Sequence, residues 1–441
     1  MKRYVGIGCS VVLLASLACS NSTKRQGTGD AGATTGASGG SAGGGGEASD
    51  DGTGGSSNST AGGTGGSDSG GSGGSSGAGA SGSGGTTGGG GPSGDTTITS
   101  VGPETGDLPF VPSNVAAPSG ASVSDVLLTG NCTIDTDDGT ISCVDAESFS
   151  YELAEIDGGI RVGLFTVNSF EIEQSAQVRV VGTRPLVIVS LTSVEIYGGL
   201  DATASNISPN GGGFTQTAPG MGGGQGGGQG SQGYNAAGGG AYCGRGGEGA
   251  LTSAVAAMMG GEPFGSPELV PLMGGSSGGG SSSGVTGGAG GGAIQIVAGL
   301  SLTVGPNGVI SAGGGGGRSN LGAGGSGGAI LLEALSVRID GTLAANGGGG
   351  AISSGGGAGQ DGQPSSVAAI GTNPTAGIGS AGDAIDGGAG TWDGTSVNSS
   401  GGGGGGAGRI RINTASGEAE IGSGATFSPS ASTECVTQGG L

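Results

Sequence analysis

Short runs of aliphatic residues recur along the chain from residue 160 onward, next to glycine-rich stretches. In residues 290–317, GGGAIQIVAGLSLTVGPNGVISAGGGGG, we expect strands at 294–297, 300–304 and 309–312. Alternation would place two sets of side chains on opposite faces: Ile294, Ile296, Leu300, Leu302 and Val304 on one, Gln295, Ser301 and Thr303 on the other. The Gly-Pro-Asn-Gly before the last strand suits a turn. The pattern therefore predicts three short strands joined by bends.

The same pattern of three short apolar runs is repeated in four other places, at residues 160–182, 184–204, 327–348 and 408–429. A unit this short cannot bury its apolar face alone, whereas copies stacked about 4.8 Å apart can. We therefore predict an all-β fold, a parallel β-helix or similar solenoid with long glycine-rich inserts. An antiparallel β-sandwich is the alternative, and it would require regularly spaced hairpin turns in place of glycine runs.

The inserts between the strand units span residues 210–291, 313–328 and 347–406. They could be flexible loops, because glycine loses much conformational entropy when it is ordered. They could also be extended polyglycine-type helices with three residues per turn, whose backbones approach closely and form hydrogen bonds. Scattered larger residues could anchor such helices, namely Phe214, Met221, Tyr234, Tyr242, Cys243, Phe264 and Trp392. The sequence leaves both interpretations open.

Composition narrows the possible functions. Glycine accounts for 120 of the 441 residues, the formal net charge is −21, and there is no histidine. After residue 25 the only basic side chains are eight scattered arginines, so no basic surface for nucleic acid is expected. Without histidine, Ser-His-Asp and Cys-His catalysis and His-ligated zinc are excluded. We predict no catalytic residues, no cofactor and no metal site.

The N-terminus predicts export. Lys2 and Arg3 precede an apolar stretch that ends at the small residue Ala18, as in a secretory signal peptide. Residues 16–19, Ser-Leu-Ala-Cys, resemble the bacterial lipoprotein box, although Ser16 stands where an aliphatic residue is usual. The resemblance implies a signal peptide at 1–18 and lipidation of Cys19, hence a lipid-anchored outer-membrane protein, for which the cell surface is the expected location. Whether it faces the periplasm or the exterior stays open.

The remaining chain divides by composition. Residues 19–97 form a linker of glycine, serine and threonine, which lacks the apolar surface needed to offset chain entropy and is predicted to be disordered. Residues 98–158 are an entry region with a hairpin, and residues 159–441 are the predicted glycine-rich solenoid domain.

Four cysteines lie beyond the predicted lipidation site at Cys19: Cys132, Cys143, Cys243 and Cys435. Cys132 and Cys143 frame a hairpin with an Asp-Gly turn, which favours a local disulfide in an exported protein. Cys243 and Cys435 would then pair over a long sequence separation, although four cysteines allow three connectivities.

The hairpin turn also carries three carboxylates, Asp135, Asp137 and Asp138. A calcium loop of the EF-hand type needs glycine at its sixth position and glutamate at its twelfth, where this chain has other residues. A tight acidic turn is therefore the preferred interpretation.

The folded part resembles the glycine-rich, β-rich surface lipoproteins of Gram-negative soil bacteria. The motifs that carry this resemblance are GGAIQI at Gly291, GGAILL at Gly327, TLAANGGGG at Thr342 and GAGRIRI at Gly406. The family implies no established enzyme activity.

The leading functional hypothesis is a non-enzymatic, lipid-anchored surface protein with a structural or adhesive role, bound to the membrane and to extracellular polysaccharide or other surface molecules. The first alternative is a polysaccharide-binding or polysaccharide-lyase β-helix protein. Its candidate charged residues are Arg184, Glu195 and Asp201 in one unit and Glu333, Arg338 and Asp340 in another. The second alternative is a calcium-stabilised adhesin.

Overall fold

The computed structural model describes residues 107–118, 123–216, 220–252, 256–281, 284, 286–318, 320–353, 357–396 and 399–441. The predicted signal peptide, Cys19 and the linker at 19–97 lie outside the described residues. Two 3₁₀ turns are described in full, η1 (Ala146–Ser148) and η2 (Asp157–Gly159). The prediction of an all-β fold is confirmed.

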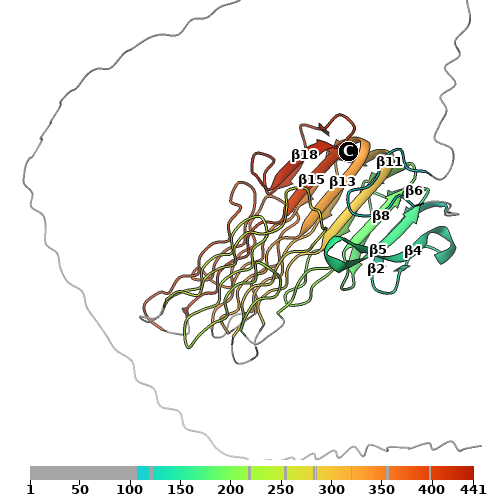
Figure 1. Cartoon of the computed structure of the whole chain (residues 1–441). Coiled ribbons are helices and arrows are strands. Elements are labelled where there is room, and N and C mark those ends of the chain that lie inside the picture. The colour runs from blue at the N-terminus through green and yellow to red at the C-terminus, as the bar shows by residue number, and fades with distance from the viewer. Residues whose placement is uncertain are drawn as a thin grey trace, which may run out of the picture. The chain divides into compact units, whose positions relative to one another are not determined.

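Two mixed sheets contain all of the described strands (Figure 1). The first sheet comprises β1 (Asp125–Leu128), β4 (Ser150–Ile156), β5 (Ile160–Val167), β6 (Ser169–Ile172), β8 (Leu186–Ser190), β9 (Ser193–Ile196), β11 (Ala293–Val304), β13 (Ala329–Ile339), β15 (Arg409–Thr414), β16 (Glu420–Ile421) and β18 (Val436–Gly440). The second comprises β2 (Asn131–Asp135), β3 (Thr140–Ile141), β7 (Gln177–Val181), β10 (Gly199–Asp201), β12 (Val309–Ser311), β14 (Thr342–Ala344) and β17 (Thr426–Ser428).

Most strand pairs are parallel. Among the described strands only β2–β3 and β4–β5 are antiparallel, whereas a sandwich built from hairpins would require antiparallel neighbours throughout. From β6 onward the chain visits the first sheet, crosses to the second, and returns. Strands from both sides of position 158 share these sheets, so the predicted entry region supplies their first strands instead of a separate layer.

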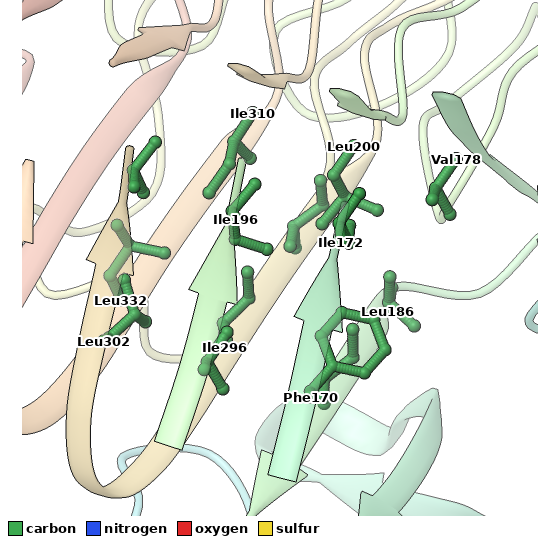
Figure 2. Packing of buried hydrophobic residues seen from close by; sticks show 14 of the residues in the cluster. Phe170, Ile172, Val178, Leu186, Ile196, Leu200, Ile296, Leu302, Ile310 and Leu332 are labelled. Atoms are coloured by element: carbon green, nitrogen blue, oxygen red, sulfur yellow. The ribbon is translucent and has the colours of Figure 1, made fainter. Parts of the chain in front are cut away.

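Corresponding residues of successive units lie in register across the second sheet. The row that points inward consists of Cys132, Val178, Leu200, Ile310, Leu343 and Phe427. In Figure 2, Ile172 and Ile196 of the first sheet point towards this row, where Leu200 and Ile310 lie. One apolar core therefore fills the space between the two sheets.

The strand predicted in two pieces at 294–297 and 300–304 is the single strand β11, whose pairing shifts between Ala298 and Ser301. Its first part pairs with β8 and its second with β9. At the shift the alternation breaks, so Leu300, predicted to face the core, is 40% exposed. Gln295, predicted on the polar face, is fully buried because other chain segments cover that face.

A second apolar cluster covers the outer face of part of the first sheet. Outward residues such as Val187 and Leu331 pack there against Val115, Leu269 and Leu272, which come from segments outside the sheets. Strands β5, β8, β11 and β13 are thus buried on both faces in this region. Double burial explains why LVIVS in β8 is an almost continuous apolar run and not an alternating one.

The described parts of the glycine-rich inserts are packed together and are not loose loops. Figure 1 shows them leaving the strands as long extended segments that run side by side. Successive N–H groups of residues 236–241 donate to three neighbouring segments in turn. The accepting carbonyl oxygens, in order, belong to Ala250, Leu321, Gln229, Gly247, Gly324 and Gly226. Donors three residues apart thus reach the same neighbour, which is the repeat of an extended helix with three residues per turn.

The segment at residues 401–408 lies at the centre of this bundle. Its N–H groups donate to three neighbouring segments, and its carbonyl groups accept from three more. These neighbours are residues 237–240, 345–351, 385–391, 247–250, 324–327 and 377–380. Because every direction around residues 401–406 is occupied by backbone, no volume is left there for side chains.

Glycine is required here for steric reasons. A Cβ added to Gly404 would lie 1.8 Å from the carbonyl oxygen of Ile378, and one added to Gly405 would lie 1.9 Å from that of Gly325. In the native chain a Cα–H group points in each of these directions, towards the carbonyl oxygen. Of the two interpretations of the inserts, packed extended helices with three residues per turn describe the structure, and flexible loops do not.

We predict that Gly404→Ala lowers the free energy of unfolding by about 1–3 kcal/mol or more, because the added methyl group collides with backbone that cannot move independently. Chemical denaturation measures the loss. The control is Gly357→Ala, where a Cβ meets no atom within 4 Å; a change within about 0.5 kcal/mol is expected there. Equal stabilities for the two variants would contradict the close-packed bundle.

Candidate functional site

Two disulfides join the four predicted cysteines as expected. Cys132–Cys143 closes the β2–β3 hairpin, with a sequence separation of 11 residues. Cys243–Cys435 has a separation of 192 residues and ties the first glycine-rich insert to the segment before β18. Both cysteines of the second bond are buried beside Ala407, at the junction of the bundle and the first sheet.

The long-range disulfide should contribute more stability than the local one. Replacing Cys243 and Cys435 by alanine should cost about 2.5 kcal/mol more than replacing Cys132 and Cys143, because the entropy of loop closure grows with the logarithm of the loop length. Denaturation of the two double variants under identical conditions gives the comparison, and similar losses would contradict the entropic origin of the difference.

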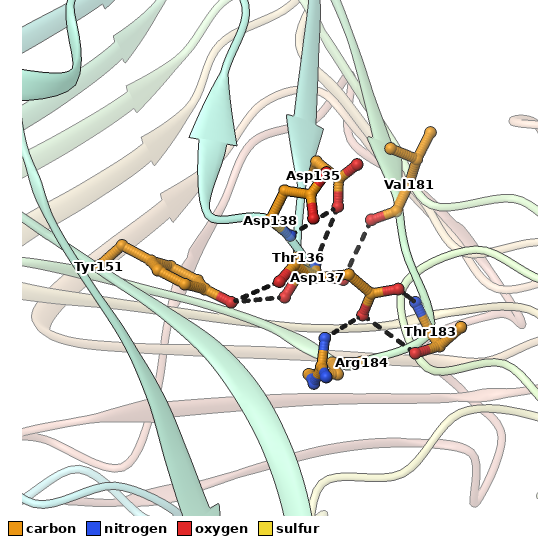
Figure 3. Close-up of polar contacts among 8 residues, drawn as sticks. All are labelled: Asp135, Thr136, Asp137, Asp138, Tyr151, Val181, Thr183 and Arg184. Carbon is orange, nitrogen blue, oxygen red and sulfur yellow. Dashed lines mark hydrogen bonds and ion pairs between the residues drawn. The ribbon is translucent and has the colours of Figure 1, made fainter. Parts of the chain in front are cut away.

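The acidic turn at residues 135–138 is a closed hydrogen-bond network (Figure 3). One Asp135 carboxylate oxygen accepts the N–H groups of Asp137 and Asp138, at 2.8 and 3.1 Å. Asp137 forms an ion pair with Arg184 and accepts the Thr183 N–H at 2.9 Å. These contacts make the turn a structural link between β2 and the segment before β8.

Tyr151 closes the same network from the other side. Its hydroxyl donates to the Thr136 carbonyl oxygen at 2.8 Å, and its ring covers Gly139, where a Cβ would lie 2.1 Å from the ring. Burial raises the pKa of the Tyr151 hydroxyl, so this donor keeps its proton at neutral pH.

The first set of charged candidates is not brought together. Arg184 pairs with Asp137, Asp201 lies on the second sheet beside Arg179, and Glu195 on β9 accepts the Tyr197 hydroxyl. Each of the three acidic or basic groups therefore has a separate structural partner.

The second set of charged candidates, Glu333, Arg338 and Asp340, lies partly at the surface and partly in the interior. Arg338 forms ion pairs with Asp340, at 2.6 Å, and with Glu420, and these hydrogen bonds raise its pKa. Glu333, on the same strand, is buried and has no contact with that group. Neither predicted set forms a convergent catalytic arrangement.

Glu333 instead holds the first described segment against the outer face of the sheet. Its carboxylate accepts the Ser113 hydroxyl at 2.5 Å, the Gln295 amide at 2.6 Å and the Asn413 amide at 3.1 Å. The Ser113 N–H lies 3.3 Å from both carboxylate oxygens. Only the lateral pairing of β11, β13 and β15 assembles this network, so no local sequence pattern indicates it.

We predict that Glu333→Gln lowers the free energy of unfolding by about 1–3 kcal/mol, because an amide NH₂ would face donors and leave buried hydrogen bonds unmade. Amide hydrogen exchange should also accelerate in residues 107–118. The matched control is Glu152→Gln on the exposed side of β4. Unchanged exchange in residues 107–118 would mean that Glu333 does not hold this segment.

A shallow groove lined by both polar and apolar residues crosses the outer face of the second sheet. It consists of two adjoining depressions of about 240 and 340 Å³ that share Gln177 and Asp201. Gly199 forms part of the floor, and the Gln177 side chain lies across it, since a Cβ on Gly199 would be 2.5 Å from the amide oxygen. Asn307 lines one side, and Gly362 and Pro364 line the first depression as well.

One buried and one partly buried polar side chain hold Gly362 and Pro364 in place. Asp361 accepts the N–H groups of Asn206 and Gly316, both at 2.8 Å, and burial raises its pKa. The buried Asn346 amide donates to the Gln363 and Ser365 carbonyl oxygens at 2.7 and 2.6 Å. The third insert thereby forms a defined wall of the groove.

The two charged side chains in the groove, Arg179 and Asp201, are positioned by their ion pair and by hydrogen bonds to Asp201. Asp201 accepts the Ser311 hydroxyl at 2.7 Å and the Thr203 N–H at 2.9 Å. It lies 3.6 Å from Arg179, whose side chain is 45% exposed. No local sequence pattern indicates this groove, because its residues come from different units and meet only through strand register.

Two other kinds of site are absent from the part of the chain that the structure describes. These residues contain no group of three or more Cys, Asp or Glu side chains placed to hold a metal ion. They also contain no helix that is long and apolar enough to span a membrane.

The chain matches no known protein-family model, and neither a characterised protein nor a solved structure is significantly similar to it.

Proposed function

We propose that this is a lipid-anchored, non-enzymatic cell-surface protein with a structural or adhesive role in the envelope. The observation that carries the proposal is the glycine bundle, in which backbone surrounds the central segment on every side. Such packing gives stiffness but leaves no interior room for convergent catalytic side chains. Functional contacts would then be made by the outer surfaces of the bundle and the sheets.

We further infer that the two sheets form a β-solenoid of stacked units. Repeated crossing between the sheets and in-register parallel pairing of successive units support this inference. A solenoid suits a surface role because each unit adds length while its neighbours bury its apolar face.

The proposed location rests on the sequence. An export signal, Cys19 as the acylated residue and a polar linker would place the described domain away from the lipid surface. The resemblance to surface lipoproteins agrees with this location, and both disulfides suit an oxidising compartment.

A labelling experiment tests the anchor. Cells that produce the protein are fed an alkynyl fatty acid, and the membrane fraction is probed for label. The native chain should carry label, and Cys19→Ser should lose both the label and membrane association. Cys9→Ser is the matched control and should stay labelled, because Cys9 lies within the predicted signal peptide. Label that persists in Cys19→Ser would contradict the proposed anchor.

A second experiment tests the role at the surface. Deleting the gene in the producing bacterium should reduce attachment to surfaces or weaken the envelope against detergent, and the native gene should restore whichever property is lost. Unchanged attachment together with an unchanged envelope would contradict the structural or adhesive role.

A further inference from the structure

We propose that the groove on the second sheet binds an uncharged, hydroxyl-rich polysaccharide. This inference rests on the proposed cell-surface role and names a ligand for it. The groove runs across the strands β2, β7, β10 and β12, so an extended chain molecule would lie perpendicular to them.

The lining supplies the donors and acceptors that sugar hydroxyls need. Asn131, Gln177 and Asn307 are exposed and make no side-chain hydrogen bond within the described residues. Each amide offers both a donor and an acceptor, and so matches a hydroxyl group in either role. Asp201 and Ser311 add fixed polar atoms at the centre.

The geometry of the sheet suits a polymer. Asn131, Gln177 and Gly199 are in-register neighbours on adjacent strands, about 4.8 Å apart in parallel sheets. This spacing is close to the length of one pyranose residue, so consecutive sugar units would meet equivalent positions on consecutive strands. At Gly199 the missing side chain leaves room for the Gln177 side chain, whose amide lies on the floor of the groove.

Charge favours a neutral ligand. The one arginine in the groove, Arg179, is offset by Asp201, and the whole chain carries a net charge of −21. A polyanion would be repelled by this field, whereas an uncharged polysaccharide would not. No aromatic residue lines either depression, so affinity would depend on hydrogen bonds repeated along the polymer.

Affinity electrophoresis of the folded protein with both disulfides intact tests the proposal. Gels contain dextran or laminarin as uncharged probes, or alginate as a polyanion. We expect retardation by at least one uncharged probe and none by alginate. The double variant Gln177→Ala/Arg179→Ala should weaken binding about tenfold, and the control Arg161→Ala, which removes an exposed arginine of β5 outside the groove, should bind like the native chain.

Three outcomes would overturn the inference: no retardation by either uncharged probe, equal binding by the double variant, or stronger binding to alginate. Circular dichroism of each variant separates lost binding from lost folding. The fatty-acid labelling of Cys19 is independent of the groove, so failure of this inference and failure of the proposed anchor give different results.

Discussion

Backbone hydrogen bonds between glycine segments are the interaction on which this structure depends. Each such bond contributes only about 0.5–1.5 kcal/mol net, and ordering glycine is entropically costly. The arrangement is stable only if nearly every backbone N–H and carbonyl group forms a hydrogen bond. The central segment at 401–408 meets this condition because it donates to three neighbours and accepts from three others.

The sheets provide the framework that brings these segments together. Each insert begins and ends at paired positions: the Gly292 N–H donates to Ala202, that of Gly328 to Ala312, and that of Gly408 to Ala345. Because the ends of each insert are held by strand pairing, less chain entropy remains to be lost when the inserts align. The Cys243–Cys435 bond adds a covalent link at the same junction.

Because the bundle interior is filled by backbone, ligands can be recognised only on the outer surfaces. Bundle interior positions are restricted to glycine and small residues, whereas outward positions on the strands are free to vary. The groove residues Gln177 and Arg179 occupy such outward positions, alternating with the core residue Val178. Glu333 shows another use of the outer face, since it anchors the segment that follows the predicted linker.

Local patterns determined the strands, the hairpin at Cys132–Cys143 and the all-β character, because alternation and turn residues act over a few neighbouring positions. The break in side-chain alternation at Leu300 could not be predicted from the sequence, since it arises from a shift in pairing with other strands. The sequence also could not predict the burial of Gln295 and Glu333 or the assembly of the groove. These features depend on contacts between residues far apart in sequence. Glycine runs have no side-chain pattern, so the sequence by itself allowed both loose and packed inserts. Only the tertiary structure, which supplies six neighbours for one segment, decided between them.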